Sequence, residues 1–203
     1  MRRLLIVMAA VLTLAGCAGE RIYAPDEAVA AARFVDAGPP TVTLFTVLAK
    51  RDGSGAHSGL MISGSERVLF DPAGSWTHPR APERNDVFFG MTPRLVDFYI
   101  DYHARETFDI VVQTVPVSQA TANALIASAL ANGASPPAHC TIANSAVLRS
   151  APEFAGLPAT WFPNKLSEAF ARLPGATYQK ITDTDAHQNH GVLMVQAAAT
   201  ADP

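Results

Sequence analysis

Cys140 is the residue of this chain best placed for nucleophilic chemistry. It lies in the stretch SPPAHCTIANSAVLRS, where two prolines at 136–137 prevent a helix and apolar side chains then recur at helical spacing. A helix is therefore expected to begin at Cys140. The unpaired backbone N–H groups and the positive dipole end of a first helical turn favour a thiolate, so we predict a reactive nucleophile. The alternative is a buried and inert thiol, which is the more common fate of a free cysteine.

A histidine and an aspartate stand at the outer ends of a predicted β-hairpin. The stretch AHSGLMISGSERVLFDPAGSW has two apolar runs on either side of turn residues at 63–65. His57 precedes the first run and Asp71 follows the second, so both lie at the same end of the hairpin. A two-residue turn would pair His57 with Pro72, whereas a loop with an odd number of residues lets Asp71 face the histidine. The sequence is compatible with both registers.

His139 stands directly before Cys140 but is not expected to act as its base. Neighbouring residues in a helical turn point about 100° apart. A zinc site built from His57, His139 and Cys140 is conceivable, because zinc takes mixed nitrogen and sulfur ligands. No paired spacing such as C-x-x-C or H-E-x-x-H supports such a site. We expect no metal and no cofactor.

The other histidines are interpreted as structural or solvated. His103 shares the apolar face of a predicted helix and is expected in the core or at its edge. His78, His187 and His190 fall in predicted loops or in the C-terminal tail, where we expect solvated side chains.

The elements that must position Cys140, His57 and Asp71 belong to one predicted α+β domain over residues 40–185. No internal repeat, Gly-rich phosphate loop or linker interrupts this range. The expected strands are 41–50, the two hairpin runs, 86–89, 108–117 and 177–181, and the expected helices begin after Thr92-Pro93, after Ser118, at Cys140 and at Asn164.

The first sixteen residues are predicted to be a signal peptide. Two arginines precede an apolar run at 4–14, which is shorter than the roughly 20 residues that span a bilayer. The sequence Leu-Ala-Gly-Cys that ends at Cys17 resembles the bacterial lipoprotein box. That resemblance implies cleavage before Cys17 and acylation of its sulfur, which leaves Cys140 as the only free thiol of the mature chain.

The same N-terminal pattern predicts where the protein resides. Ala18 follows the acylated cysteine, which implies sorting to the outer membrane, with the protein facing the periplasm. Residues 17–39 are then a lipidated tether that contains a short helix. Residues 186–203 are Ala-rich and are expected to form a flexible tail.

The composition argues against nucleic acid as a partner. The chain has 15 basic and 18 acidic residues and no basic cluster, and loss of two arginines with the signal peptide leaves a net charge of −5. With 16% charged and 49% hydrophobic residues it is typical of one globular domain with a substantial core. The expected partner is a membrane, through the lipid on Cys17.

Three stretches together resemble a known family. HSGLMI is followed by VLFDPAGSW on a partner strand, and, after the helix VSQATANALIASAL, a cysteine opens HCTIANSAVL. This order resembles the circularly permuted NlpC-type papain-like cysteine hydrolases, which include bacterial lipoproteins of the YaeF/YiiX kind and are distantly related to lecithin:retinol acyltransferase. The resemblance covers residues 41–181. It implies a permuted papain-like fold with an antiparallel sheet packed against helices.

The resemblance also implies roles for three residues. Cys140 would be the nucleophile, His57 the general base and Asp71 the third residue, which orients the imidazole. Relatives commonly have Asn before the cysteine, where His139 stands here.

Location and resemblance together predict a lipid-anchored thiol hydrolase or acyltransferase. It would act on an amide, ester or thioester of a peptidoglycan peptide or an acyl lipid, and the sequence does not choose between these substrates. The alternative is a non-catalytic envelope lipoprotein that uses the same fold as a binding or structural module, for which the unusual His139 is the motivating feature.

Overall fold

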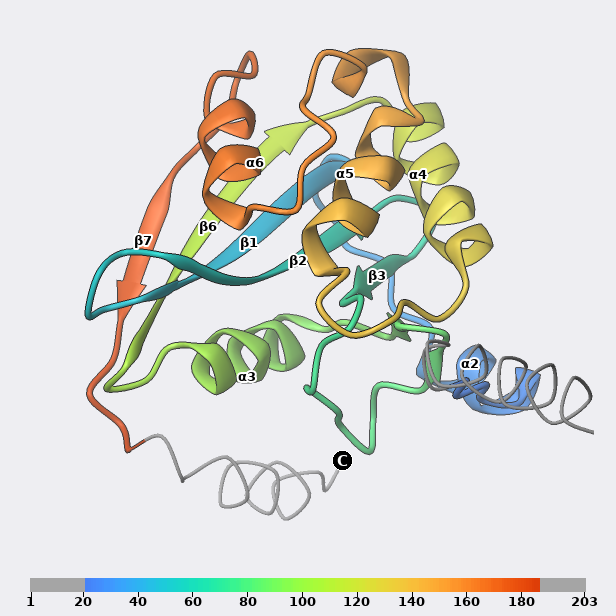
Figure 1. The fold of residues 1–203 in the computed structure, drawn as a ribbon. Coiled ribbons are helices and arrows are strands. Elements are labelled where there is room, and N and C mark those ends of the chain that lie inside the picture. The colour runs from blue at the N-terminus through green and yellow to red at the C-terminus, as the bar shows by residue number, and fades with distance from the viewer. Residues whose placement is uncertain (1–20, 187–203) are drawn as a thin grey trace, which may run out of the picture.

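The computed structural model describes residues 21–186, which form an α+β fold around one seven-stranded antiparallel sheet (Figure 1). The strand order across the sheet is β4-β5-β3-β2-β1-β6-β7. The strands are β1 (Thr41–Ala49), β2 (Gly55–Ser63), β3 (Arg67–Phe70), β4 (Glu83–Arg84), β5 (Val87–Phe89), β6 (Phe108–Pro116) and β7 (Gln179–Thr182). The helices are α2 (Asp26–Ala32), α3 (Pro93–His103), α4 (Gln119–Asn132), α5 (Cys140–Arg149) and α6 (Pro163–Phe170), with a 3₁₀ turn, η2, at Pro152–Phe154. The predicted α+β class is confirmed.

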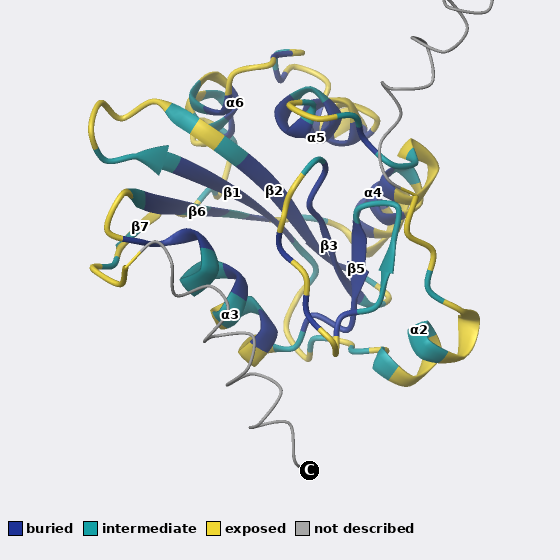
Figure 2. Ribbon diagram, turned by 60° about the horizontal axis from the view of Figure 1, so that its bottom comes forward, coloured by how far each residue is buried: buried dark blue, intermediate teal, exposed yellow. Residues whose placement is uncertain are grey.

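Helices cover both faces of the sheet, with α4, α5 and α6 on one face and α3 on the other (Figures 1 and 2). Each face has its own hydrophobic core. Leu60 and Phe70 pack toward α4–α6, whereas Met61 and Leu69 pack toward α3. The central strand β1 is buried on both faces, which explains why it reads TVTLFTVLA instead of alternating apolar and polar residues.

The loop of the predicted hairpin contains three residues. Ser63 pairs with Arg67 and Leu60 with Phe70, so Gly64, Ser65 and Glu66 form the connection. The odd-length register is therefore the correct one, and it puts Asp71 on the same face of the sheet as His57.

Two of the helices start with capping bonds that the sequence predicts. The Thr92 side chain accepts a hydrogen bond from Leu95 N before α3, and Ser118 accepts one from Thr121 N before α4. Helix α5 begins at Cys140, as predicted, so the candidate nucleophile lies in a first helical turn.

The described part of the predicted tether lies along the edge of the sheet. Ala24 N donates to Glu83 O at 2.8 Å, and Arg67 N donates to Phe34 O at 2.9 Å. The chain is therefore held against the domain from about residue 22 onward. The predicted signal peptide, Cys17 and the tail from residue 187, with His187 and His190, lie outside the described residues. Within 21–186, none of the helices has both the length and the apolar composition needed to cross a bilayer.

Candidate active site

The site forms where strand β3 stops. β3 ends at Phe70, which pairs with Leu60, so β2 continues outward beyond its partner. In the observed register Pro72 would face Ser58, but proline has no N–H to donate, which explains why the ladder ends here. The first turn of α5 lies against this stretch of β2, which has no β3 partner, and a backbone hydrogen bond joins Ser58 to the thiol of Cys140.

Three buried polar side chains fasten α5 to β2 at this point. The Ser58 hydroxyl lies 3.0 Å from the Thr141 hydroxyl, and the Asn144 amide donates to the Ser58 carbonyl at 2.8 Å. All three residues are fully buried. Because Ser58 follows His57 and Thr141 follows Cys140, these bonds fix the two candidate catalytic residues relative to one another.

Cys140 is a buried thiol, with 8% of its surface exposed. Burial raises the pKa of this thiol, but hydrogen bonding and charge interaction with His57, together with bonds from Thr141 and Ser58, lower it to about 7. An ordinary cysteine has a pKa near 8.5. The pKa of this thiol is therefore below that of an ordinary cysteine, and His57 is the main group that lowers it.

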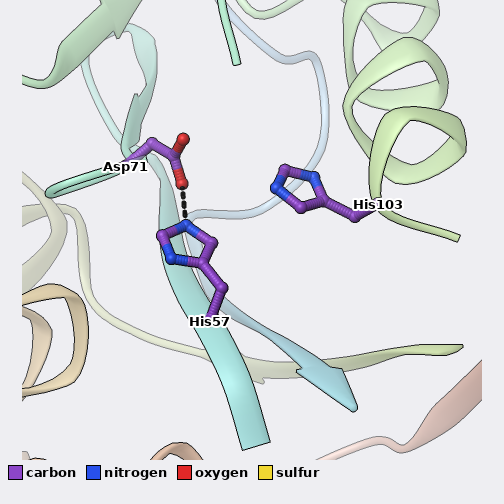
Figure 3. A group of neighbouring side chains, drawn as sticks. All are labelled: His57, Asp71 and His103. Carbon is purple, nitrogen blue, oxygen red and sulfur yellow. Dashed lines mark hydrogen bonds and ion pairs between the residues drawn. The ribbon is translucent and has the colours of Figure 1, made fainter. Parts of the chain in front are cut away.

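His57 and Asp71 are in direct contact. His57 Nε2 lies 2.7 Å from Asp71 Oδ1 (Figure 3). The Tyr99 hydroxyl donates to the same oxygen at 2.7 Å. Gly59 pairs with Phe45 of β1 and, on the β3 side, is the residue opposite Asp71. A Cβ at Gly59 would lie 2.2 Å from the Tyr99 hydroxyl and 3.1 Å from Asp71 Oδ1, so only glycine leaves room for this contact.

His57 and Asp71 hold opposite charges. Burial lowers the pKa of His57, but the charge and hydrogen bond of Asp71, followed by those of Cys140, raise it to about 10. Burial raises the pKa of Asp71, but His57, then His103 and the Tyr99 hydroxyl, lower it below the usual range. Between about pH 7 and 10 the site therefore contains a Cys140 thiolate beside a His57 imidazolium.

Sequence reasoning missed two residues of this site, His103 and Tyr99. The ring of His103, on α3, lies parallel to that of His57 with centroids 5.6 Å apart, and its Nδ1 donates to the Tyr99 carbonyl at 2.8 Å. His103 is buried, as expected, but it lies beside the candidate catalytic pair. The signal was available: Tyr99 and His103 are four residues apart on the apolar face of the predicted helix, so they share a direction.

The structure corrects the expectation for His78 and supports the interpretation of His139. The expectation of a solvated His78 is wrong, because it is 6% exposed and its ring stacks between those of Trp76 and Phe98. Loop residues carry no periodicity from which such cover could be read. His139 is turned away from the site, with its Nδ1 bonded to the Pro137 carbonyl at 3.0 Å and its ring against Trp161.

Two cavities flank the His57–Asp71 pair. One, of about 410 Å³, is lined by His57, His103 and Arg105, and the other, of about 460 Å³, is lined by Asp71 and Pro137. Both share the segment 73–75 as a wall. The pair is thus reachable from both sides of this segment.

Two groups of side chains have spacing that suits a metal ion. The first is His57, Asp71 and His103, whose ligand atoms lie within 4.8 Å of one another. The second is an acidic group formed by Asp101, Asp183 and Asp185, and Arg105 already bridges Asp101 and Asp185 at 3.4 and 3.5 Å. The trio of His57, His139 and Cys140 considered from the sequence does not meet this criterion within residues 21–186.

Comparisons of the chain with protein-family models, curated proteins and solved structures found no match.

Proposed function

We propose that this protein is a thiol hydrolase or acyltransferase in which Cys140, His57 and Asp71 act together. The observation that carries the proposal is the placement of an activated thiol at the start of α5, fastened to the strand that carries a histidine bonded at 2.7 Å to a buried carboxylate. Nucleophile, base and orienting group are the three parts that acyl transfer through a cysteine needs.

The chemistry follows from the order of contacts. The Cys140 thiolate attacks the carbonyl carbon of an amide, ester or thioester, and the electron pair of the C=O bond moves to oxygen. His57 then gives its proton to the leaving group as that bond breaks, which leaves a thioester on Cys140. Water, deprotonated by His57, or an acceptor nucleophile resolves the thioester and restores the thiolate.

The local structure supports each role. Asp71 occupies Nε2 of His57 (Figure 3), so the opposite ring nitrogen, Nδ1, is the one left to bond the Cys140 thiol. The backbone N–H of Cys140 is in the first helical turn, where no intrahelical carbonyl is available, and it supplies a donor for the oxyanion.

The proposed fold is a circularly permuted papain-like arrangement of the NlpC type. The chain order His57, Asp71, Cys140 supports it, as does the antiparallel sheet against which the cysteine-bearing helix packs. The proposed location is the periplasmic side of the outer membrane, through a lipid on Cys17. A peptidoglycan peptide and an acyl lipid are the two substrate classes that this location offers.

The test is hydrolysis of a chromogenic acyl ester and an acyl thioester by the full chain and by three variants. Cys140→Ala abolishes turnover, and His57→Gln lowers it by about 10²–10⁴, the range of a general acid–base group. His139→Gln is the matched control, because His139 adjoins Cys140 but faces Trp161, and it retains activity. Mass spectrometry after rapid quenching shows the acyl group on Cys140. Equal turnover by Cys140→Ala contradicts the proposal.

The second candidate is a non-catalytic envelope module. The burial of Cys140, with 8% of its surface exposed, is the observation that favours it. In that case the thiol resists small electrophiles until the protein unfolds, and none of the three variants changes a hydrolytic rate.

A further inference from the structure

We propose that His57, Asp71 and His103 form a Zn²⁺ site that inhibits the enzyme when it is occupied. The three residues come from β2, from the loop after β3 and from α3, so the fold brings them together from distant parts of the sequence. The binding half of the proposal stands on geometry alone. The inhibition half rests on the proposed function.

The side chains converge on one point. Figure 3 shows the Nε2 atoms of His57 and His103 both directed toward the carboxylate of Asp71. One ligand atom from each residue lies within 4.8 Å of the other two. Tetrahedral ligands on one zinc ion at about 2.1 Å lie about 3.4 Å apart, so side-chain rotations that move the ligand atoms by about 1 Å complete the site.

Tyr99 holds two of the three ligands in the orientation that metal binding needs. Its carbonyl accepts from His103 Nδ1 at 2.8 Å, so Nε2 is the ring nitrogen directed toward Asp71 (Figure 3). Its hydroxyl donates to Asp71 Oδ1 at 2.7 Å. Backbone carbonyls and hydroxyls in these positions are the usual outer partners of metal-binding histidines and carboxylates.

The carboxylate retains unused capacity for a cation. Asp71 is 2% exposed, and within the described part of the chain its Oδ2 has no hydrogen-bond partner. Two imidazole nitrogens and one carboxylate oxygen suit zinc better than magnesium or calcium, which prefer oxygen ligands. The cavity of about 410 Å³ lined by His57 and His103 gives the ion a route from solvent.

Zinc at this site would stop the reaction without touching the nucleophile. The ion takes the place of the proton on His57 Nε2, and that proton leaves to solvent. The ring then keeps its Nδ1 proton facing Cys140, so the thiolate still has its hydrogen-bond donor. A neutral, zinc-bound imidazole is a much weaker acid than an imidazolium, so His57 no longer protonates the leaving group, and formation of the thioester fails.

The experiment uses the full chain with Cys17→Ser, in which Cys140 is the only thiol. We expect one Zn²⁺ to bind per chain by calorimetry, and Co²⁺ to give visible d–d bands without a thiolate charge-transfer band. With Zn²⁺ bound, ester hydrolysis stops while iodoacetamide still labels Cys140 at the same pH.

Two variants locate the ion. His103→Gln weakens Zn²⁺ binding at least about tenfold, since even the loss of an outer partner costs that much. His139→Gln binds Zn²⁺ as the parent does. Should His103→Gln fail to fold, the Co²⁺ spectrum and the labelling of the parent chain still decide the question.

Three results overturn the proposal: no Zn²⁺ binding, binding unaffected by His103→Gln, or a thiolate-to-cobalt band with protection of Cys140, which would place the metal on the sulfur. Failure of the proposed function is distinguishable. A chain that binds Zn²⁺ through His103 but hydrolyses no acyl substrate supports the zinc site and contradicts the proposed hydrolase activity.

Discussion

Removal of the His57 imidazole should change the reactivity of Cys140 in opposite directions at low and high pH. The folded thiol has a pKa of about 7, below the roughly 8.5 to 9.0 of an ordinary cysteine. In His57→Gln the largest favourable influence is lost while the burial of the thiol remains, so we expect its pKa to return to about 9 or above.

The size of the effect follows from two opposing factors. At pH 6 about 9% of a thiol with pKa 7 is ionised, against about 0.1% of one with pKa 9, a ratio of about 90. Thiolates of lower pKa are weaker nucleophiles, and two pKa units lower the intrinsic rate about eightfold. The parent should therefore react about tenfold faster than His57→Gln at pH 6, and about fourfold more slowly at pH 9.

The assay is the reaction of dithiodipyridine with the Cys17→Ser chain, followed by absorbance from pH 5 to 10. Both proteins bury the thiol in the same place, so limited access affects both rates and cancels in their ratio. His139→Gln should superimpose on the parent. Parallel profiles for the parent and His57→Gln, both with a midpoint near pH 8.5 to 9, would refute the activated pair, and absence of reaction before unfolding would show an inert thiol.

Three further predictions test the elements around the pair. Asp71→Asn should lower turnover by about 10²–10⁴ while circular dichroism is unchanged, because His57 loses the partner that fixes its tautomer; unchanged turnover would move that role to another group. Gly59→Ala should lower the free energy of unfolding by about 1–3 kcal/mol in urea melts, because the new methyl group meets the Tyr99 hydroxyl at 2.2 Å, and an unaffected midpoint would contradict the close packing. Cys17→Ser should abolish incorporation of a palmitate analogue in cells, and equal labelling of the variant would exclude the lipid anchor.

The sequence predicted the elements of the site better than their contacts. Turn and cap residues are local signals, so the hairpin, the helix that starts after Ser118 and the start of α5 at Cys140 could be placed from the sequence. The register between His57 and Asp71 could not, because the loop at 63–65 allowed either two or three residues. One residue in that loop decides which face of the sheet Asp71 occupies.

Contacts between distant elements were beyond the reach of periodicity. The face of α3 that carries Tyr99 and His103 was identified, but nothing in its spacing shows that this face would lie against His57. His78 was misjudged for a related reason, since the rings that cover it, those of Trp76 and Phe98, belong to a loop and a helix that are separate in the sequence. Burial of loop side chains depends on tertiary packing, which a single sequence does not encode in any period.

The interruption of the sheet is what allows the cysteine and the histidine to meet. Alternate residues of β2 point to opposite faces, so His57 faces α3 while Ser58 faces α5. A helix on one face of a continuous sheet could not reach a side chain on the other. The end of β3 before Pro72 leaves the edge of β2 open at this position, and α5 places Cys140 there. The chain that follows β3 also places Asp71 beside His57. Both contacts of His57, with Cys140 and with Asp71, therefore depend on the early end of β3.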